Sequence, residues 1–289
     1  AREGLQHADL VAEVDAARQR ARQHFTTATR LDPHRSHPHA ALADLAWLDG
    51  DRDAARQHAA AALAVDPTTP LDHDRLTEGL DWQARRDLYR SLVERYQASP
   101  RNDPRKTATL RFFAARAALD GLAFADAATE FRRVLADDPA AHNAHYYLFL
   151  AHHHLGELDL AEQHAVAYAS FGAQKFADVV RLLPSEQRVQ ITAMLQSLGD
   201  RAYGAERVAA SRDLNHVVAC LMDSADAWNN HAFLCRETGR FDDASASYAH
   251  ALEREPDSPQ LWNDAAVVLQ YHQPTPANLT ATLEQLRAV

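Results

Sequence analysis

The hydrophobic positions of residues 39–67 follow the period of an α-helix, and a single glycine interrupts them. The apolar and small residues of this segment recur after three or four positions within each half: Leu42 and Ala43 before Ala46, and Ala55 before Ala59 and Ala62. This spacing places them on one face of each of two helices, with a turn at Gly50 between them. Pro67 ends the second helix because proline lacks the backbone N–H that a continuing helix needs. The segment is therefore predicted to be a helix, a turn and a second helix.

The same pattern recurs along the chain. Residues 228–256 repeat it in the same order: Trp228, Ala232, Cys235, Gly239, Ala244, Tyr248, Ala251 and Pro256. Three pairs of equivalent positions are each 34 residues apart: Ala21 and Ala55, Pro33 and Pro67, and Ala127 and Ala161. A period of this length is typical of stacked helix pairs. We expect an all-α fold in which two helices approach most closely at five alanines: Ala21, Ala55, Ala127, Ala161 and Ala244.

Two segments depart from this regularity. Residues 71–100 keep the apolar spacing but lack the small residues, so this unit is expected to be degenerate. Gly156 and Gly239 are 83 residues apart, which is 15 more than two periods of 34. The excess lies near residues 176–184, where we expect an additional helix. This predicts a regular array over residues 1–171, an irregular unit over 172–222, and further pairs with a capping helix over 223–289.

The order of residue types in each unit resembles the tetratricopeptide repeat family. Its motif has a large residue and small residues on the first helix, glycine at the turn, then alanine, an aromatic residue, alanine and proline. Residues 228–256 match it most closely, residues 39–67 and 142–171 match well, and residues 5–33 and 108–139 match chiefly in their second helices. The resemblance covers nearly the whole chain and implies a right-handed α-solenoid of about eight antiparallel helix pairs.

In that family the first helices line a concave groove that binds a peptide or protein segment. The family's groove positions fall on these residues of the present chain: Phe112, Arg116, Leu119, Tyr146, Leu150, His153, Asn229, Phe233, Arg236, Asn263 and Val267. Aromatic rings supply contact area, while asparagine and arginine can bond a peptide backbone or carboxylates. The resemblance therefore implies a protein–protein interaction scaffold. A subclass that clamps chaperone C-termini is not favoured, because Asn229 and Asn230 lack the flanking lysines.

Charge and composition narrow the classes of partner. The net charge of −10 and the isoelectric point near 5.9 argue against binding nucleic acids or anionic membranes. Pentatricopeptide arrays, which bind RNA, have a similar period, but the acidic balance and the alanine, glycine and proline signature favour the tetratricopeptide interpretation. No apolar stretch approaches the ~20 residues of a membrane span. We expect a cytoplasmic protein, and we interpret the scarcity of lysine as the coding bias of a GC-rich bacterial genome.

Candidate chemistry is sparse. The densest of the 17 histidines lie on one predicted helix: His142, His145, His152, His153 and His154. His145 and His152 occupy packing positions, and no cysteine pair or carboxylates complete a metal-ligand set, so no metal is predicted. Phosphate loops, nucleophile elbows and metalloprotease motifs are absent, so no catalytic residue, enzyme activity or cofactor is predicted. Cys220 and Cys235 lie within apolar helical patterns and are expected to be buried thiols.

Two further interpretations stay open. The chain could be the regulatory or substrate-docking region of a larger enzyme, because tetratricopeptide arrays are often fused to catalytic domains. Since the sequence begins at Ala1 rather than methionine, a leader or neighbouring domain is expected to have been removed. Assembly into a homo-oligomer is also compatible with such an array.

Overall fold

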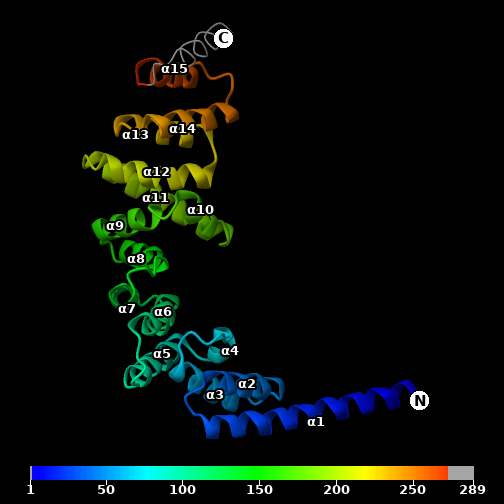
Figure 1. Cartoon of the computed structure of the whole chain (residues 1–289). Helices are drawn as coiled ribbons and strands as arrows, with labels where there is room; N and C mark the ends of the chain where they lie inside the picture. Colours follow the sequence, from blue (N-terminus) through cyan, green and yellow to red (C-terminus); the bar gives the residue numbers. More distant parts are fainter. Residues whose placement is uncertain (1, 273–289) are drawn as a thin grey trace. The chain divides into compact units, whose positions relative to one another are not determined.

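The computed structural model describes residues 2–272, and every regular element in that range is helical. Contacts divide the chain into two compact units, residues 1–144 and residues 145–289, which we call unit 1 and unit 2 (Figure 1). Helix α8 (Asn143–His154) crosses the boundary. The all-α prediction is confirmed for the described residues. The three-part division at residues 171 and 222 follows repeat regularity rather than contacts and stays a prediction.

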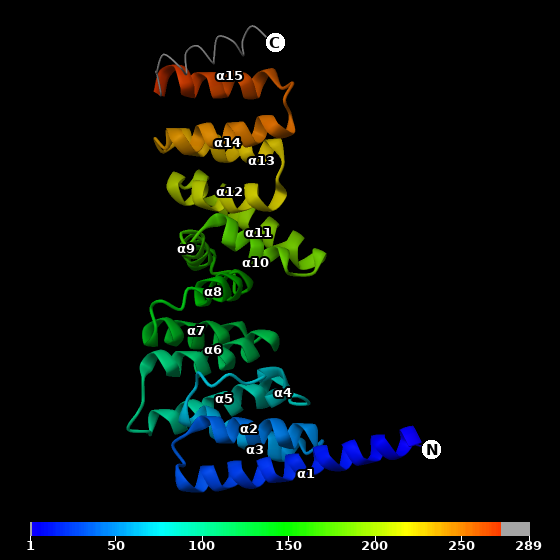
Figure 2. The ribbon, with the colours of Figure 1, turned by 45° about the vertical axis from the view of Figure 1, so that its right-hand side comes forward.

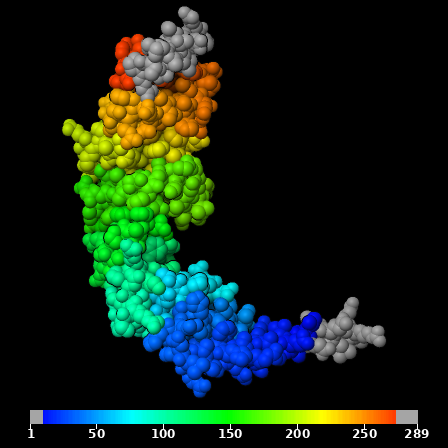
Figure 3. All heavy atoms as spheres, in the orientation of Figure 1, coloured from blue at the N-terminus to red at the C-terminus, as the bar shows by residue number. Residues whose placement is uncertain are grey.

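Unit 1 contains two regular helix pairs. Its helices are α1 (Arg2–Leu31), α2 (Ser36–Leu48), α3 (Arg52–Val65), α4 (His73–Thr77), α5 (Trp82–Gln97), α6 (Pro104–Asp120) and α7 (Phe124–Asp137). Short turns join α2 to α3 and α6 to α7, and the members of each pair lie side by side (Figure 2). The degenerate unit retains only one turn of its first helix, α4, and a full second helix, α5. Figure 3 shows the described part of α1 extending past the other helices of unit 1.

Unit 2 contains most of α8, which pairs with α9, two further regular pairs and an additional helix. Its helices after α8 are α9 (Leu158–Ala169), α10 (Ala173–Arg181), α11 (Ser185–Gly204), α12 (Val208–Met222), α13 (Ala225–Glu237), α14 (Phe241–Arg254), α15 (Pro259–Val267) and a π-helix, η1 (Val268–His272). Besides α8 and α9, which meet at His145 and His164, the pairs are α11 with α12 and α13 with α14. Helix α10 lies at the predicted insertion and buries Phe176 and Val180 against the core of this unit. The capping helix predicted over residues 277–288 lies outside the described residues.

Small side chains lie on the buried faces of the paired helices. Ala55, Ala127, Ala161 and Ala244 are buried, as the repeat spacing predicts. Ala21 is only half-buried, because α1 packs chiefly against α2 and residues 10–17 of α1 are exposed. The prediction is therefore confirmed at four positions and incomplete at the fifth.

The turn between the two helices of a pair uses a left-handed backbone. Gly50, Gly156 and Gly239 have φ of +79°, +74° and +72°, which glycine adopts without penalty. Leu122 and Glu206 occupy the corresponding turns with φ of +57° and +60°. A residue with a side chain loses roughly 1–2 kcal/mol in this conformation. The turn geometry thus persists where the glycine of the motif is missing, which explains why residues 108–139 matched the motif chiefly in their second helix.

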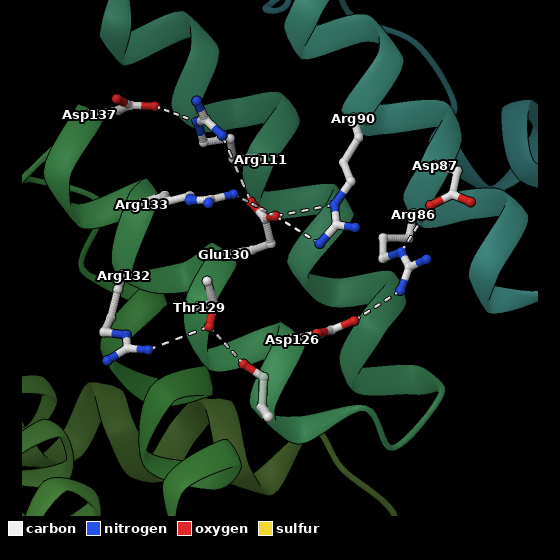
Figure 4. Close-up of polar contacts among 11 residues, drawn as sticks. Arg86, Asp87, Arg90, Arg111, Asp126, Thr129, Glu130, Arg132, Arg133 and Asp137 are labelled. Atoms are coloured by element: carbon white, nitrogen blue, oxygen red, sulfur yellow. Dashed lines mark hydrogen bonds and ion pairs between the residues drawn. The ribbon is translucent and has the colours of Figure 1, made fainter.

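Buried carboxylates on the second helices join neighbouring pairs through arginines. Glu130 of α7, with only 2% of its side chain exposed, accepts a hydrogen bond from Arg90 Nη2 of α5 at 2.9 Å and from Arg133 Nη1 at 3.1 Å (Figure 4). Arg111 of α6 lies 3.8 Å from the same carboxylate. In unit 2, Glu162 of α9 similarly accepts two hydrogen bonds from Arg207, at 2.7 and 2.6 Å. Each unit therefore fixes the position of adjacent helices through one enclosed carboxylate.

Enlarging an alanine at a helix contact is expected to destabilise unit 2. Ala244 of α14 is fully buried, so Ala244→Leu forces a larger side chain into a packed contact and is expected to cost about 1–3 kcal/mol of stability. Ala249→Leu, on the exposed side of the same helix, should change stability by less than about 0.5 kcal/mol. Thermal unfolding followed by circular dichroism compares them. Equal melting temperatures for Ala244→Leu and the unchanged chain would contradict the proposed packing.

Neutralising Glu130 is expected to destabilise unit 1. Glu130→Gln keeps the shape but leaves Arg90 and Arg111 without their shared negative charge, at a cost of about 1–3 kcal/mol because these arginines are partly exposed. Glu94→Gln on α5 is the matched control, since Glu94 is exposed and forms no ion pair with a described residue. Urea unfolding measures both. Indistinguishable midpoints for the two variants would show that the buried ion pairs do not stabilise the unit.

Candidate functional site

Three of the groove residues implied by the family resemblance lie along one face of α13. Asn229, Phe233 and Arg236 are spaced by four and three residues, so they follow one side of the helix, and all three are half-buried. The Arg236 guanidinium lies 5.2 Å from the centre of the Phe233 ring, within the range of a cation–π contact. Tyr203 of α11 meets the same ring edge to face at 6.3 Å. We call these four residues the α13 surface.

The α13 surface has hydrogen-bonding capacity that the described part of the chain does not use. Asn229 Oδ1 is enclosed and accepts no hydrogen bond from any described residue. An unpaired amide oxygen in such a place usually costs about 1–3 kcal/mol. Arg236 is 3.8 Å from the Glu237 carboxylate, its only described ion pair. The surface thus combines two aromatic rings, an arginine and an unsatisfied amide.

In unit 1 the predicted groove residues lie on α6. Phe112, Arg116 and Leu119 are half-buried on this first helix. Phe112 meets Phe131 of α7 edge to face at 5.5 Å and lines a hollow of about 380 Å³. The structure therefore places an aromatic ring beside a cavity at this face.

The prediction for Tyr146 is wrong. Its side chain is buried in the core of unit 2, 5.7 Å from the Tyr168 ring and 5.9 Å from the Phe176 ring. Phe176 belongs to the inserted helix α10, which a regular repeat lacks, so a position that faces a groove in the family is covered here. Leu150 and His153 of α8 are half-buried, and Asn263 of α15 is exposed.

The second-helix side of unit 2 carries a polar cleft that the sequence analysis did not identify. It has a volume of about 290 Å³ and is lined by residues of α12, α13 and α14. His231 stacks on His216 at 4.2 Å, and its Nδ1 lies 2.8 Å from Ser247 Oγ. Ser247 Oγ donates a hydrogen bond to the Asp243 carbonyl oxygen. Only the spacing of His216, His231 and Ser247 on three successive helices could have suggested this cluster.

His231 also meets a cysteine, although neither group is activated. Its Nε2 lies 3.3 Å from Cys235 Sγ. Burial lowers the pKa of His231 to about 3 and raises the pKa of Cys235 to about 11. Both groups are therefore neutral at neutral pH, whereas a nucleophilic cysteine needs a thiolate. Cys220 and Cys235 are buried free thiols, which confirms that expectation.

The histidines of α8 form contacts within unit 2. His145 Nδ1 lies 3.0 Å from His164 Nδ1, and the buried His152 bonds Glu157 through Nδ1 at 2.5 Å. Across residues 2–272, no three histidine, cysteine or acidic side chains are placed to hold a metal ion. Within the same range, no helix has the length and apolar character needed to cross a membrane.

The buried histidines predict that stability falls in mild acid. Burial lowers the pKa of both His231 and His216, whereas the unfolded chain binds protons with an ordinary histidine pKa near 6.5. As the pH decreases from about 6.5 towards 3, His231 binds a proton in the unfolded state but not in the folded state, so the free energy of unfolding decreases by up to about 1.4 kcal/mol per pH unit. His216 acts in the same direction. Urea unfolding between pH 7.5 and 5 measures this slope. His231→Gln should reduce it, and an unchanged slope would contradict the assignment.

Comparison with known proteins gives one sequence match and several distant structural likenesses. The tetratricopeptide repeat profile matches residues 225–258, the segment that forms α13 and α14. No curated protein matches the sequence significantly. Similar structures include YrrB, described as a TPR protein with an unusual peptide-binding site, at 13% identity over 82% of this chain and 94% of that chain, with a TM-score of 0.37.

Two further structures of this kind are the TPR2AB domain of yeast Sti1, solved as a pHSP90 complex, and BtubC from P. vanneervenii. The first has 13% identity over 88% of this chain and 90% of that chain, with a TM-score of 0.36. The second has 16% identity over 83% and 89%, with a TM-score of 0.34. Residues 225–258, which form α13 and α14, therefore carry a tetratricopeptide repeat, and the buried alanines and left-handed turns of the other helix pairs follow the same pattern.

Proposed function

We propose that this chain is a protein–protein interaction scaffold whose first-helix faces bind a segment of another protein, with the α13 surface as a principal contact. The observation that carries the proposal is the half-buried Phe233 ring, which contacts both Arg236 and Tyr203. Aromatic and arginine side chains contribute most of the binding energy at many protein interfaces. A ring that neighbouring groups already orient loses little conformational entropy when a ligand packs on it.

The polar groups of the α13 surface suit a peptide ligand. The Arg236 guanidinium can donate hydrogen bonds to a carboxylate or a backbone carbonyl of the ligand. The Asn229 amide has an unsatisfied oxygen, and a modest rotation of the side chain would let it accept a backbone N–H. An extended or helical segment that packs an apolar residue on Phe233 would use all three groups.

The remaining predicted positions would extend this contact. Leu150 and His153 on α8 and Asn263 on α15 lie on first helices of unit 2, and Phe112 and Arg116 lie on the first helix α6 of unit 1. Their mixture of apolar, aromatic and polar side chains is typical of interaction surfaces. We propose that they contribute to binding the same or further segments, whereas Tyr146 contributes only to packing.

Replacing Phe233 and Arg236 is expected to abolish partner binding without unfolding the chain. Phe233→Ala with Arg236→Ala removes a ring and a guanidinium, which at an interface costs about 2–4 kcal/mol and so lowers affinity by a factor of about 30 or more. The immobilised wild-type and variant chains are incubated with extract of the native host, and the captured proteins are quantified by mass spectrometry. Circular dichroism checks that helicity is retained.

The matched control removes the same kinds of group from the second-helix side of unit 2. Arg240→Ala with His250→Ala deletes an exposed guanidinium and an exposed ring, and the captured proteins should be unchanged. Capture that survives the loss of Phe233 and Arg236, or falls equally in the control, would contradict the proposed surface.

A further inference from the structure

The hollow beside Phe112 lies within unit 1, between the start of α6 and the segment that follows α7. Its floor is apolar and includes Ala108, Phe112 and Phe113 of α6 and Val134 of α7. Ala108 and Val134 are buried, and the two phenylalanine rings meet edge to face at 6.2 Å. The volume of about 380 Å³ is enough for one large side chain. The shape and the lining therefore suit an apolar anchor residue.

The rim of this hollow carries a positive charge that the described part of the chain leaves without a counter-charge. Arg105, in the first turn of α6, is exposed, and its guanidinium forms no ion pair or hydrogen bond with a described residue. The adjacent Lys106 is different, because its Nζ lies 3.0 Å from Asp66 Oδ1. Lys106 is therefore neutralised within unit 1, whereas the neighbouring Arg105 is not.

The rim also carries a negative charge, Asp138, that lacks a counter-charge among the described residues. Asp138 ends α7 as Asp66 ends α3, with similar extended backbone angles. The carboxylate of Asp66 accepts the Lys106 ion pair, whereas that of Asp138 accepts only the backbone N–H of Ala140, at 3.1 Å. No described cation lies within 4.0 Å of Asp138, and Arg105 and Asp138 do not pair with each other. At the equivalent position after α3, the Asp66 carboxylate is neutralised by Lys106.

We propose that this hollow binds a protein segment in which a large apolar side chain is flanked by an acidic residue on one side and a basic residue on the other. The apolar side chain fills the hollow against Phe112 and Val134. The acidic residue pairs with Arg105, and the basic residue pairs with Asp138. This inference rests on the proposed function as a scaffold, and it assigns a ligand chemistry to unit 1 that is independent of the α13 surface in unit 2.

Paired charges at the mouth favour this occupant over a purely apolar or uniformly charged one. A segment with acidic residues on both sides would bring like charge to Asp138, and one with basic residues on both sides would bring like charge to Arg105. Like-charge contacts of this kind reject wrong partners more effectively than matched contacts add affinity. Specificity should therefore depend on the opposite signs of the two flanks.

Synthetic peptides test the proposal directly on the full chain. A fluorescein-labelled, capped peptide with glutamates on one side of a central phenylalanine and lysines on the other is titrated in both sequence orders by fluorescence polarisation. Comparison peptides carry lysine on both sides, glutamate on both sides, or alanine in place of the phenylalanine. We expect the mixed-charge peptide to bind best in one order, and the alanine peptide to bind at least about tenfold more weakly.

Charge reversal at the rim makes the test specific to this hollow. Arg105→Glu should weaken the mixed-charge peptide at least about fivefold and strengthen the peptide with lysine on both sides. Asp138→Asn, which keeps the hydrogen-bond acceptor of the turn, should reduce the preference for a basic flank. Thr109→Trp fills the hollow and should abolish binding of every peptide. Arg95→Glu reverses an exposed arginine on α5 and should leave all affinities unchanged.

The outcomes separate this inference from the proposed function. Absence of peptide binding, equal affinity for all the peptides, or identical affinities in the wild type and Arg105→Glu would overturn the ligand assignment. If partner capture still depended on Phe233 and Arg236 in that case, the scaffold function would stand. Circular dichroism and melting temperature of each variant establish that a lost affinity does not reflect unfolding.

Discussion

The close approach of paired helices at small side chains is the constraint on which the structure depends. A helix pair can bury its apolar face only if no large side chain separates the two backbones, and Ala55, Ala127, Ala161 and Ala244 meet that condition. Once the pairs form, each second helix meets its neighbours through aromatic and aliphatic residues such as Phe131 and Tyr248, which are fully buried. The first helices then retain one face that packing within the pair does not use.

The two helices of a pair differ in whether their charged side chains are neutralised by neighbouring helices. Second helices enclose carboxylates, and arginines from neighbouring helices neutralise them, as Arg90 does for Glu130 and Arg207 does for Glu162. Such contacts satisfy both partners within the unit, so they stabilise the relative position of adjacent helices rather than attract a ligand. On the first-helix side, Arg236 lies over the Phe233 ring instead, and Arg105 lines the hollow that includes Phe112 and has no described counter-charge. This difference is the reason to assign binding to the first helices.

The sequence predicted the helix pairs because glycine at the turn and proline at the helix end determine the backbone locally, and alanine recurs at a fixed spacing on the packed faces. The insertion was also visible, since the distance between Gly156 and Gly239 exceeded two periods, and α10 lies in that interval. The covering of Tyr146 was not predictable, because it depends on where α10 packs in three dimensions. The same holds for the arginine–carboxylate pairs, whose members are 40 and 45 residues apart and meet only when successive repeats stack. Leu122 and Glu206 show that a turn can keep its backbone geometry without the residue that signals it.

Hydroxyl-radical footprinting of the native chain tests the central claim most directly, because it measures side-chain exposure without a ligand. Tyr203, on the first-helix side of unit 2, is 46% exposed, whereas Tyr248 on the second helix α14 is 1% exposed. If small residues bring the helices together as described, Tyr203 will be oxidised rapidly, and Tyr248 will be oxidised only after the chain is unfolded in urea. Comparable oxidation rates for the two tyrosines in the native chain would contradict the packing and, with it, the assignment of the free face to the first helices.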